Sequence, residues 1–137
     1  MNVYQLSYRS KATNYFKVGD LDSMLETAIQ NNERANISGC LVFYNNCFVQ
    51  ILEGTKANVI SLYNTIKKDI RHHDLDLLWQ GEVDKKYFKE WGMLCHTDQS
   101  TDEKAFVNNL LLLSEFSEKS TATLLTFWLA VKEVLEL

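Results

Sequence analysis

Hydrophobic and polar residues follow two different periods along this chain. Alternation at period two predicts strands at residues 2–9, 37–44, 47–54, 75–83 and 88–96. Apolar residues at helical spacing predict helices from an N-cap at Asp20 or Asp22 to Asn31–Asn32, from Gly54–Thr55 to Ile70, over 102–116 and over 120–136. The predicted order is therefore βαββαββ followed by two helices.

The first and third predicted strands have the clearest patterns. Tyr4, Leu6 and Tyr8 share one face of the first strand, which we expect to be buried more deeply than the opposite face. Asn45–Asn46 joins the second and third strands, and asparagine tolerates the positive φ of a tight hairpin. We therefore expect these two strands to pair directly.

The first six elements have the order of the ferredoxin-like split βαβ fold. We therefore predict an α+β fold, a ferredoxin-like βαββαββ sheet with two helices on one face plus two C-terminal helices. Right-handed crossovers place the third strand beside the first, antiparallel, at the centre of the sheet. Tyr8 and Gln50 then project toward the same space between the two helices.

Composition limits the possible partners. The chain has 137 residues, 46% hydrophobic and 23% charged, and a net charge of −4, which predicts one globular domain and disfavours a nucleic-acid-binding face. No apolar run reaches the roughly 20 residues of a membrane span. The N-terminus lacks the layout of a signal peptide, so we expect a cytoplasmic protein without a membrane partner.

The sequence lacks the motifs of several common catalytic and metal-binding sites. Cys40, Cys47 and Cys95 form no CxxC pair, so we expect reduced thiols and no metal site. The sequence contains no glycine-rich phosphate loop, no HExxH pair and no triad-like grouping. We therefore do not expect an enzyme.

A few polar residues stand out against an apolar background. Gln50 lies among apolar neighbours in a central strand, where its amide needs partners, and the Tyr8 phenol is a natural one. The alternatives are a structural hydrogen-bonded pair and a Gln50 that faces solvent. Asn31 and Asn32 either cap the first helix or direct an amide toward a ligand.

Two further groups have an ordinary structural interpretation as well as a functional one. Arg71 and His72 follow the second helix, where cations suit the negative helix end. Trp91 and Met93 share one face of the last strand and on their own indicate core packing. Spacing alone therefore predicts a small binding or sensor domain with a polar cluster in an apolar pocket.

In combination these residues resemble the BLUF family of flavin-dependent blue-light sensors. The resemblance covers roughly residues 2–96 and rests on Tyr8 with Ser10, Asn31-Asn32, Ile37-Ser38-Gly39, the run from Phe48 to Gly54, Asp69-x-Arg71-His72-His73 and Trp91-x-Met93. It implies a core at residues 1–97 that binds FAD, with FMN or riboflavin as alternatives, and a helical output or oligomerisation extension at residues 98–137.

The resemblance also assigns roles to individual residues. Asn32, helped by Asn31, reaches the flavin carbonyl and N3 edge, Gln50 addresses N5 and the C4 carbonyl, and Arg71 faces the C2 carbonyl. Asp69 and His72 hold Arg71 or the ribityl chain. Apolar walls come from residues such as Met24, Leu25, Ile29, Leu41, Phe48 and Ile66.

The resemblance implies a photochemical switch. Light draws an electron and a proton from Tyr8, and the Gln50 amide rotates or tautomerises while the charge is displaced. Trp91 and Met93 then compete for the place beside Gln50 and pass the signal to the C-terminal helices. The exposed apolar residues expected over 124–135 suggest a homo-oligomer or a separate signalling protein as partner.

Three other functions remain as alternatives. An acylphosphatase-like hydrolase needs a phosphate-cradling arginine loop, for which Arg9 followed by SKAT is a poor candidate. A flavin oxidoreductase needs a nicotinamide site, and an RNA-binding sheet needs basic flanks around exposed aromatic residues. The acidic balance of the chain disfavours the last of these.

Overall fold

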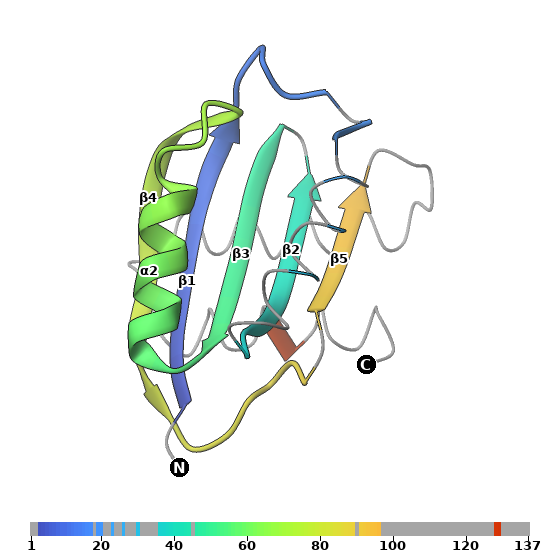
Figure 1. The fold of residues 1–137 in the computed structure, drawn as a ribbon. Coiled ribbons are helices and arrows are strands. Elements are labelled where there is room, and N and C mark those ends of the chain that lie inside the picture. Colours follow the sequence, from blue (N-terminus) through green and yellow to red (C-terminus); the bar gives the residue numbers. More distant parts are fainter. Residues whose placement is uncertain are drawn as a thin grey trace.

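The computed structural model describes residues 3–17, 19, 20, 23, 26, 30, 36–44, 46–89, 91–96, 128 and 129. Within these residues the elements are β1 (Val3–Ala12), β2 (Ser38–Tyr44), β3 (Cys47–Gly54), α2 (Lys56–Ile66), β4 (His72–Val83) and β5 (Trp91–His96). The five strands form one sheet with α2 lying across one of its faces beside β1 (Figure 1). None of the helices in this described part is long and apolar enough to cross a membrane.

The sheet has the strand order β4-β1-β3-β2-β5. β1 pairs antiparallel with both β3 and β4, β2 pairs antiparallel with β3, and β5 adds to β2 in parallel. The predicted α+β class and the position of the third strand beside the first are therefore confirmed. The predicted hairpin is also present, since β2 and β3 pair directly and Asn46 has a φ of 61°.

The second helix is shorter than predicted, and β4 begins earlier. α2 ends at Ile66 instead of Ile70, because the amides of Lys68 and Asp69 bond to the carbonyls of Thr65 and Ile66 in a turn. The Asp69 carboxylate then accepts a hydrogen bond from the Arg71 amide at 2.9 Å, which turns the chain away from the helix axis. His72, expected at the helix end, is the first residue of β4.

The bounds of β1 and β5 also differ from the predicted ones. β1 extends to Ala12 instead of residue 9, because Ser10 pairs with β3, Ala12 with β4 and Lys11 with both. β5 begins at Trp91 instead of residue 88. Phe88 lies in the connector between β4 and β5 and is buried.

α2 begins where predicted and holds the core against one sheet face. The Thr55 side chain caps the helix by accepting a hydrogen bond from the Asn58 amide at 3.3 Å. Val59 and Tyr63 are its buried residues. They pack in a core cluster that also contains Tyr4, Leu6, Tyr8, Ile37 and Leu52.

Four described residues support the predicted first helix. Asp20, Ser23, Glu26 and Gln30 are helical, and the last three are exposed. Asp20 is itself helical, and its carboxylate accepts a hydrogen bond from the Lys17 amide at 2.9 Å, as in a capping box; the alternative cap, Asp22, lies outside the described residues. The apolar positions of this helix lie outside the described residues, as do most residues of the two predicted C-terminal helices.

The sheet face opposite α2, called the far face below, is buried as well. It carries Gln5, Ser7 and Glu53, each at most 6% exposed. Along β1, however, this face also includes the half-buried Val3 and Arg9 and the exposed Lys11, whereas the Tyr8 face is buried from Tyr4 to Ser10. The prediction that the Tyr8 face is the more deeply buried one is therefore confirmed.

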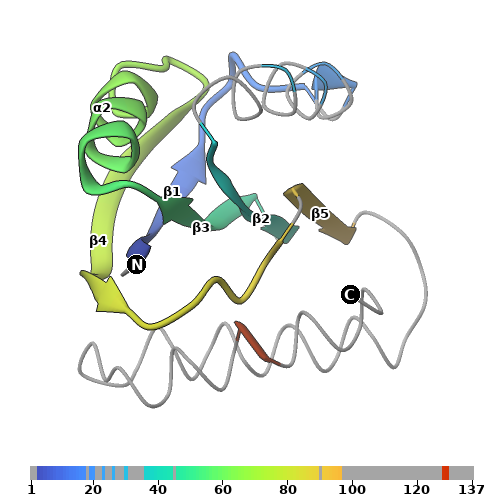
Figure 2. The same cartoon turned by 60° about the horizontal axis from the view of Figure 1, so that its bottom comes forward.

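The connector after β4 runs beneath the far face, and residues 128–129 lie beneath it too (Figure 2). Trp128 is only 2% exposed, which corrects the expectation of exposed apolar residues at that position, whereas Leu129 is 49% exposed.

Candidate functional site

Tyr8 and Gln50 form a buried hydrogen-bonded pair at the centre of the sheet. They are direct cross-strand partners in the β1–β3 register. The Tyr8 hydroxyl donates to Gln50 Oε1, and the two residues are 3% and 6% exposed. The interpretation of Gln50 as a solvent-facing residue is therefore wrong.

The other end of the Gln50 amide has no hydrogen-bond acceptor within the described part of the chain. Among the residues that the structure describes, none accepts a hydrogen bond from Gln50 Nε2. A buried donor left unpaired costs about 1–3 kcal/mol, so this position favours an external acceptor. The polar edge of a flavin ring carries such acceptors on a flat apolar body, and the site therefore fits this group.

A second tyrosine–glutamine pair in the same sheet gives a useful contrast. The Tyr4 hydroxyl donates to Gln80 Oε1 at 2.8 Å. Gln80 is exposed, so water can satisfy its amide nitrogen. Burial therefore distinguishes Gln50 from Gln80, because the Gln50 amide cannot rely on water for its second hydrogen bond.

Aromatic rings enclose the Tyr8 phenol. The Tyr63 ring lies 5.6 Å from it and the His72 ring 6.2 Å. Burial raises the pKa of Tyr8 far above its usual value of 10.0, and the negative potentials of Tyr63 and Asp69 add to the shift. Tyr8 therefore stays protonated and remains the donor in its bond to Gln50.

Contacts at both ring nitrogens fix His72 beside the Tyr8 ring. The His72 Nε2 lies 2.7 Å from the Ile66 carbonyl oxygen, so Nε2 must carry a proton, and its Nδ1 lies 2.8 Å from Ser10 Oγ. Both ring nitrogens are thus engaged, and neither holds Arg71. The contact with Ser10 explains why a serine two residues after Tyr8 belongs to the site, a link that spacing alone did not reveal.

Asp69 and Arg71 pair with each other beside the site. The Asp69 carboxylate accepts hydrogen bonds from Arg71 Nε at 2.9 and 3.1 Å. This bonding lowers the pKa of Asp69 and raises the pKa of Arg71. The guanidinium is thereby fixed at the end of the turn that follows α2.

The sheet register places the last strand in line with the Tyr8–Gln50 pair. Leu41 pairs with Gln50 on one side and with Met93 on the other. Trp91 pairs with Gly39, two residues away along the strand. The side chains of Trp91 and Met93 lie outside the described residues, as do Asn31, Asn32, Met24, Leu25 and Ile29.

The predicted apolar walls fall into two clusters. Leu41 and Phe48 pack with Phe16 and Phe43. Ile66 is half-buried and packs against the cluster that contains Tyr8. The described walls of the predicted slot therefore flank the pair on two sides.

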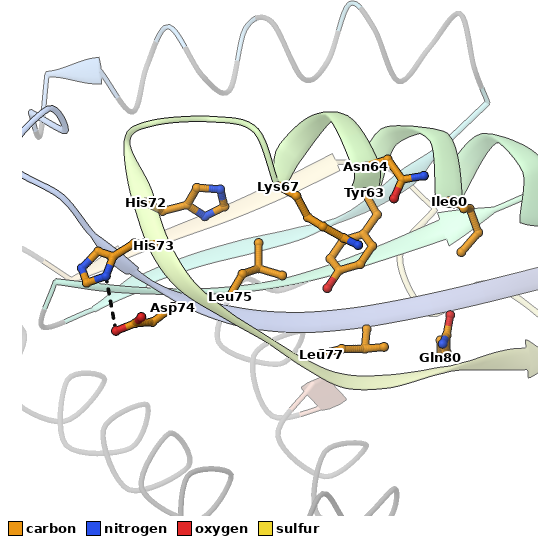
Figure 3. Close-up of a pocket in the computed structure, with 10 residues that line it drawn as sticks. All are labelled: Ile60, Tyr63, Asn64, Lys67, His72, His73, Asp74, Leu75, Leu77 and Gln80. Atoms are coloured by element: carbon orange, nitrogen blue, oxygen red, sulfur yellow. Dashed lines mark ion pairs between the residues drawn. The ribbon is translucent and has the colours of Figure 1, made fainter.

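A hollow of about 650 Å³ lies between α2 and β4 (Figure 3). Tyr63 and His72, which both contact the Tyr8 ring, also line this hollow. The Lys67 amine lies 4.7 Å from the centre of the Tyr63 ring. The pattern of the sequence did not predict this hollow, because it depends on the early start of β4.

The fold and the site together define a small α+β domain with a buried glutamine amide held by a tyrosine at the centre of its sheet. A profile of the family described as BLUF, sensors of blue-light using FAD, matches residues 3–94. The chain belongs to the BLUF family.

Two relatives are subunits of a photoactivated adenylate cyclase from Euglena gracilis. The alpha subunit is 37% identical over 83 residues, which are 61% of this chain and 8% of that protein. The beta subunit is 35% identical over 95 residues, which are 69% of this chain and 11% of that protein. The chain therefore spans about a tenth of the length of these relatives.

Solved structures give a similar result. The photo-activated state of BlsA has a TM-score of 0.74 at 31% identity, over 93% of this chain and 92% of that one. A bacterial light-regulated adenylyl cyclase has a TM-score of 0.73 at 26% identity, over 80% of this chain and 34% of that one. The family thus contains chains of about this length as well as larger proteins with a cyclase.

Proposed function

We propose that this chain is a blue-light photoreceptor that binds FAD non-covalently and switches through Tyr8 and Gln50. The observation that carries the proposal is the buried Gln50 amide, which accepts from Tyr8 at one end and has no acceptor at the other among the described residues. Membership of the BLUF family supports the choice of flavin.

Several residues would hold the flavin. Gln50 would donate to its N5 and C4 carbonyl edge, Asn32, helped by Asn31, would bind the ring's carbonyl and N3 edge, and Arg71 would face the C2 carbonyl. The apolar walls include Leu41, Phe48 and Ile66, with Met24 and Leu25 from the first helix. A bound flavin supplies absorption of blue light and, when excited, a strongly oxidising group.

The residues of the site then move one electron and one proton. With a bound, excited flavin as the electron acceptor, Tyr8 would give up an electron, and its phenolic proton would pass along the existing hydrogen bond to the Gln50 amide oxygen. The high pKa of Tyr8 supports this coupling, because the neutral phenol holds its proton until the electron leaves. After the Gln50 amide has rotated or tautomerised, the electron would return to Tyr8 together with one proton from the group of the Gln50 side chain that then faces the phenolic oxygen, so that protons and electrons balance while the donor and acceptor atoms of Gln50 have exchanged places.

The changed amide alters the hydrogen bonds around Gln50. One gained or lost bond is worth about 1 kcal/mol, enough to bias a strand that has two arrangements. We propose that β5, through Trp91 and Met93, carries this bias to the C-terminal extension at residues 98–137. The extension then acts by self-association or on a separate signalling protein, and the described part of the chain contributes no catalytic group of its own.

The two tyrosine–glutamine pairs provide a matched test. The purified protein is expected to be yellow and to show a small red shift of its flavin absorption after blue light. Tyr8→Phe and Gln50→Leu should each keep the flavin and lose the shift, while Tyr4→Phe and Gln80→Leu should keep both. A colourless protein after reconstitution with FAD, or a normal shift in either of the first two variants, would refute the proposal.

A further inference from the structure

A chain of hydrogen bonds connects Gln50 to the C-terminal segment through the sheet. Ser7 Oγ donates to the Gln50 carbonyl oxygen at 3.1 Å. The indole Nε1 of Trp128 donates to the same Ser7 Oγ at 3.1 Å. Ser7 is fully buried and Trp128 is 2% exposed, so water does not compete for these bonds.

Ser7 and Tyr8 hold Gln50 from opposite faces of the sheet. They are consecutive residues of β1, so Tyr8 bonds the Gln50 side chain on the α2 face and Ser7 bonds its backbone carbonyl on the far face. The β1–β4 register shifts between these two residues, with Ser7 opposite Trp79 and Tyr8 opposite Leu77. Such irregularities locally disrupt the strand ladder, which allows this part of β1 to respond to Gln50.

The indole ring of Trp128 is held in place by its neighbours, so a shift of Ser7 alters the hydrogen bond between the two residues. Its ring packs edge-to-face on Phe88, with the ring centres 5.9 Å apart. The Phe88 amide in turn donates to the buried Glu53 carboxylate at 2.7 Å, and the Phe88 carbonyl accepts from Ser38. The indole ring therefore has a firm support, and a movement of Ser7 changes the geometry of its N–H bond.

We propose that Ser7 and Trp128 are positioning residues that transmit the state of the Gln50 amide to the C-terminal segment across the far face. This inference rests on the proposed function and adds a second route beside the one through β5. When the Gln50 amide reverses, the Gln50 carbonyl and Ser7 shift together and the Trp128–Ser7 bond changes. Coupling is reciprocal, so Trp128 also biases the switch.

Nuclear magnetic resonance of the full chain labelled with ¹⁵N-tryptophan tests the route. The three tryptophans give three indole signals, and Trp128→Phe identifies the signal of Trp128. Blue light is expected to shift this signal in the wild-type protein. Ser7→Ala should keep the flavin absorption shift and abolish the response of Trp128, and Ser7→Thr, which retains the hydroxyl, should restore it.

Two controls separate transmission from packing. Cys40→Ala removes the thiol of another buried residue of the sheet, whose bond in the described part of the chain is to the Leu41 carbonyl, and should leave the light response of Trp128 intact. Trp128→Phe keeps an aromatic ring on Phe88 but loses the N–H, and we expect dark recovery to change by about fivefold, the effect of one hydrogen bond. Trp79→Phe, which removes an indole N–H that donates to Gln5 within the described part of the chain, should recover at the wild-type rate.

The outcomes distinguish this inference from the proposed function. A wild-type protein without a flavin absorption shift would overturn both. A normal absorption shift with an unmoved Trp128 signal would overturn this inference alone. So would a Trp128 response that survives Ser7→Ala, or a Trp128→Phe variant with wild-type recovery.

Discussion

Replacement of Glu53 by glutamine tests the buried polar network of the far face. Glu53 is completely buried. Its carboxylate accepts from the amides of Tyr87 and Phe88 and from Gln5 Nε2, at distances of 2.7 to 3.0 Å. Gln5 Oε1 in turn accepts from Trp79 Nε1 at 3.1 Å.

The geometry sets the cost of the substitution. An amide has one oxygen, which can serve the Tyr87 and Phe88 amides, so its NH₂ group must face the NH₂ group of Gln5. If Gln5 flips to accept from the new NH₂, its own NH₂ then faces the Trp79 N–H. One hydrogen bond to a charged group is lost in either case, so we expect Glu53→Gln to lower the free energy of unfolding by about 2 kcal/mol.

Urea unfolding measures this change, with Glu26→Gln as the control. Glu26 is exposed, so its substitution should stay within about 0.5 kcal/mol of the wild type. Trp79→Phe removes the indole N–H that holds the Gln5 amide in its present orientation, so Gln5 can then turn to accept from the new NH₂ group at position 53. In a double-mutant cycle, the Trp79→Phe background should therefore reduce the stability loss caused by Glu53→Gln by about 1 kcal/mol. A Glu53→Gln variant as stable as the wild type, or additive effects in the cycle, would refute this account of the network.

Two further predictions concern pH. Burial raises the pKa of Tyr8, so the protonated phenol contributes fully to stability below the usual tyrosine pKa of 10.0, and this contribution declines as the pH rises above that value. Tyr8→Phe should therefore flatten the loss of stability at alkaline pH, measured by urea unfolding. The pKa of Asp69 is lowered by Arg71, so its contribution is complete above 3.8 and is lost as the pH falls through the folded-state pKa. Asp69→Asn should remove this acid dependence, which stays below about 1 kcal/mol because the pair is partly exposed.

The core of the site was predictable from the sequence because topology and alternation act together. The βαββαβ order with right-handed crossovers puts β1 beside β3. Period-two alternation then places Tyr8 and Gln50 on the same face. Since one residue is a phenol and the other a buried amide, their hydrogen bond follows from the need to satisfy buried polar atoms.

Contacts between distant segments were not predictable in the same way. The contact between Ser7 and Trp128 joins residues 121 positions apart, and an apolar stripe in a sequence does not say which surface will cover it. The start of β4 at His72 likewise depends on pairing with the end of β1, which overrides the local pattern of a helix end. Local sequence propensity therefore indicates which kind of element a segment forms, whereas pairing with a neighbouring strand decides at which residue that element begins or ends.

Infrared difference spectroscopy on protein labelled with ¹³C at the glutamine side-chain carbonyl tests the central claim most directly. The account predicts a labelled carbonyl band that changes position on blue illumination and reverts in the dark. Gln50→Leu should abolish this band, while Gln80→Leu should leave it unchanged. A normal red shift of the flavin without any glutamine carbonyl band, or a band that persists in Gln50→Leu, would contradict the claim that Gln50 is the switch.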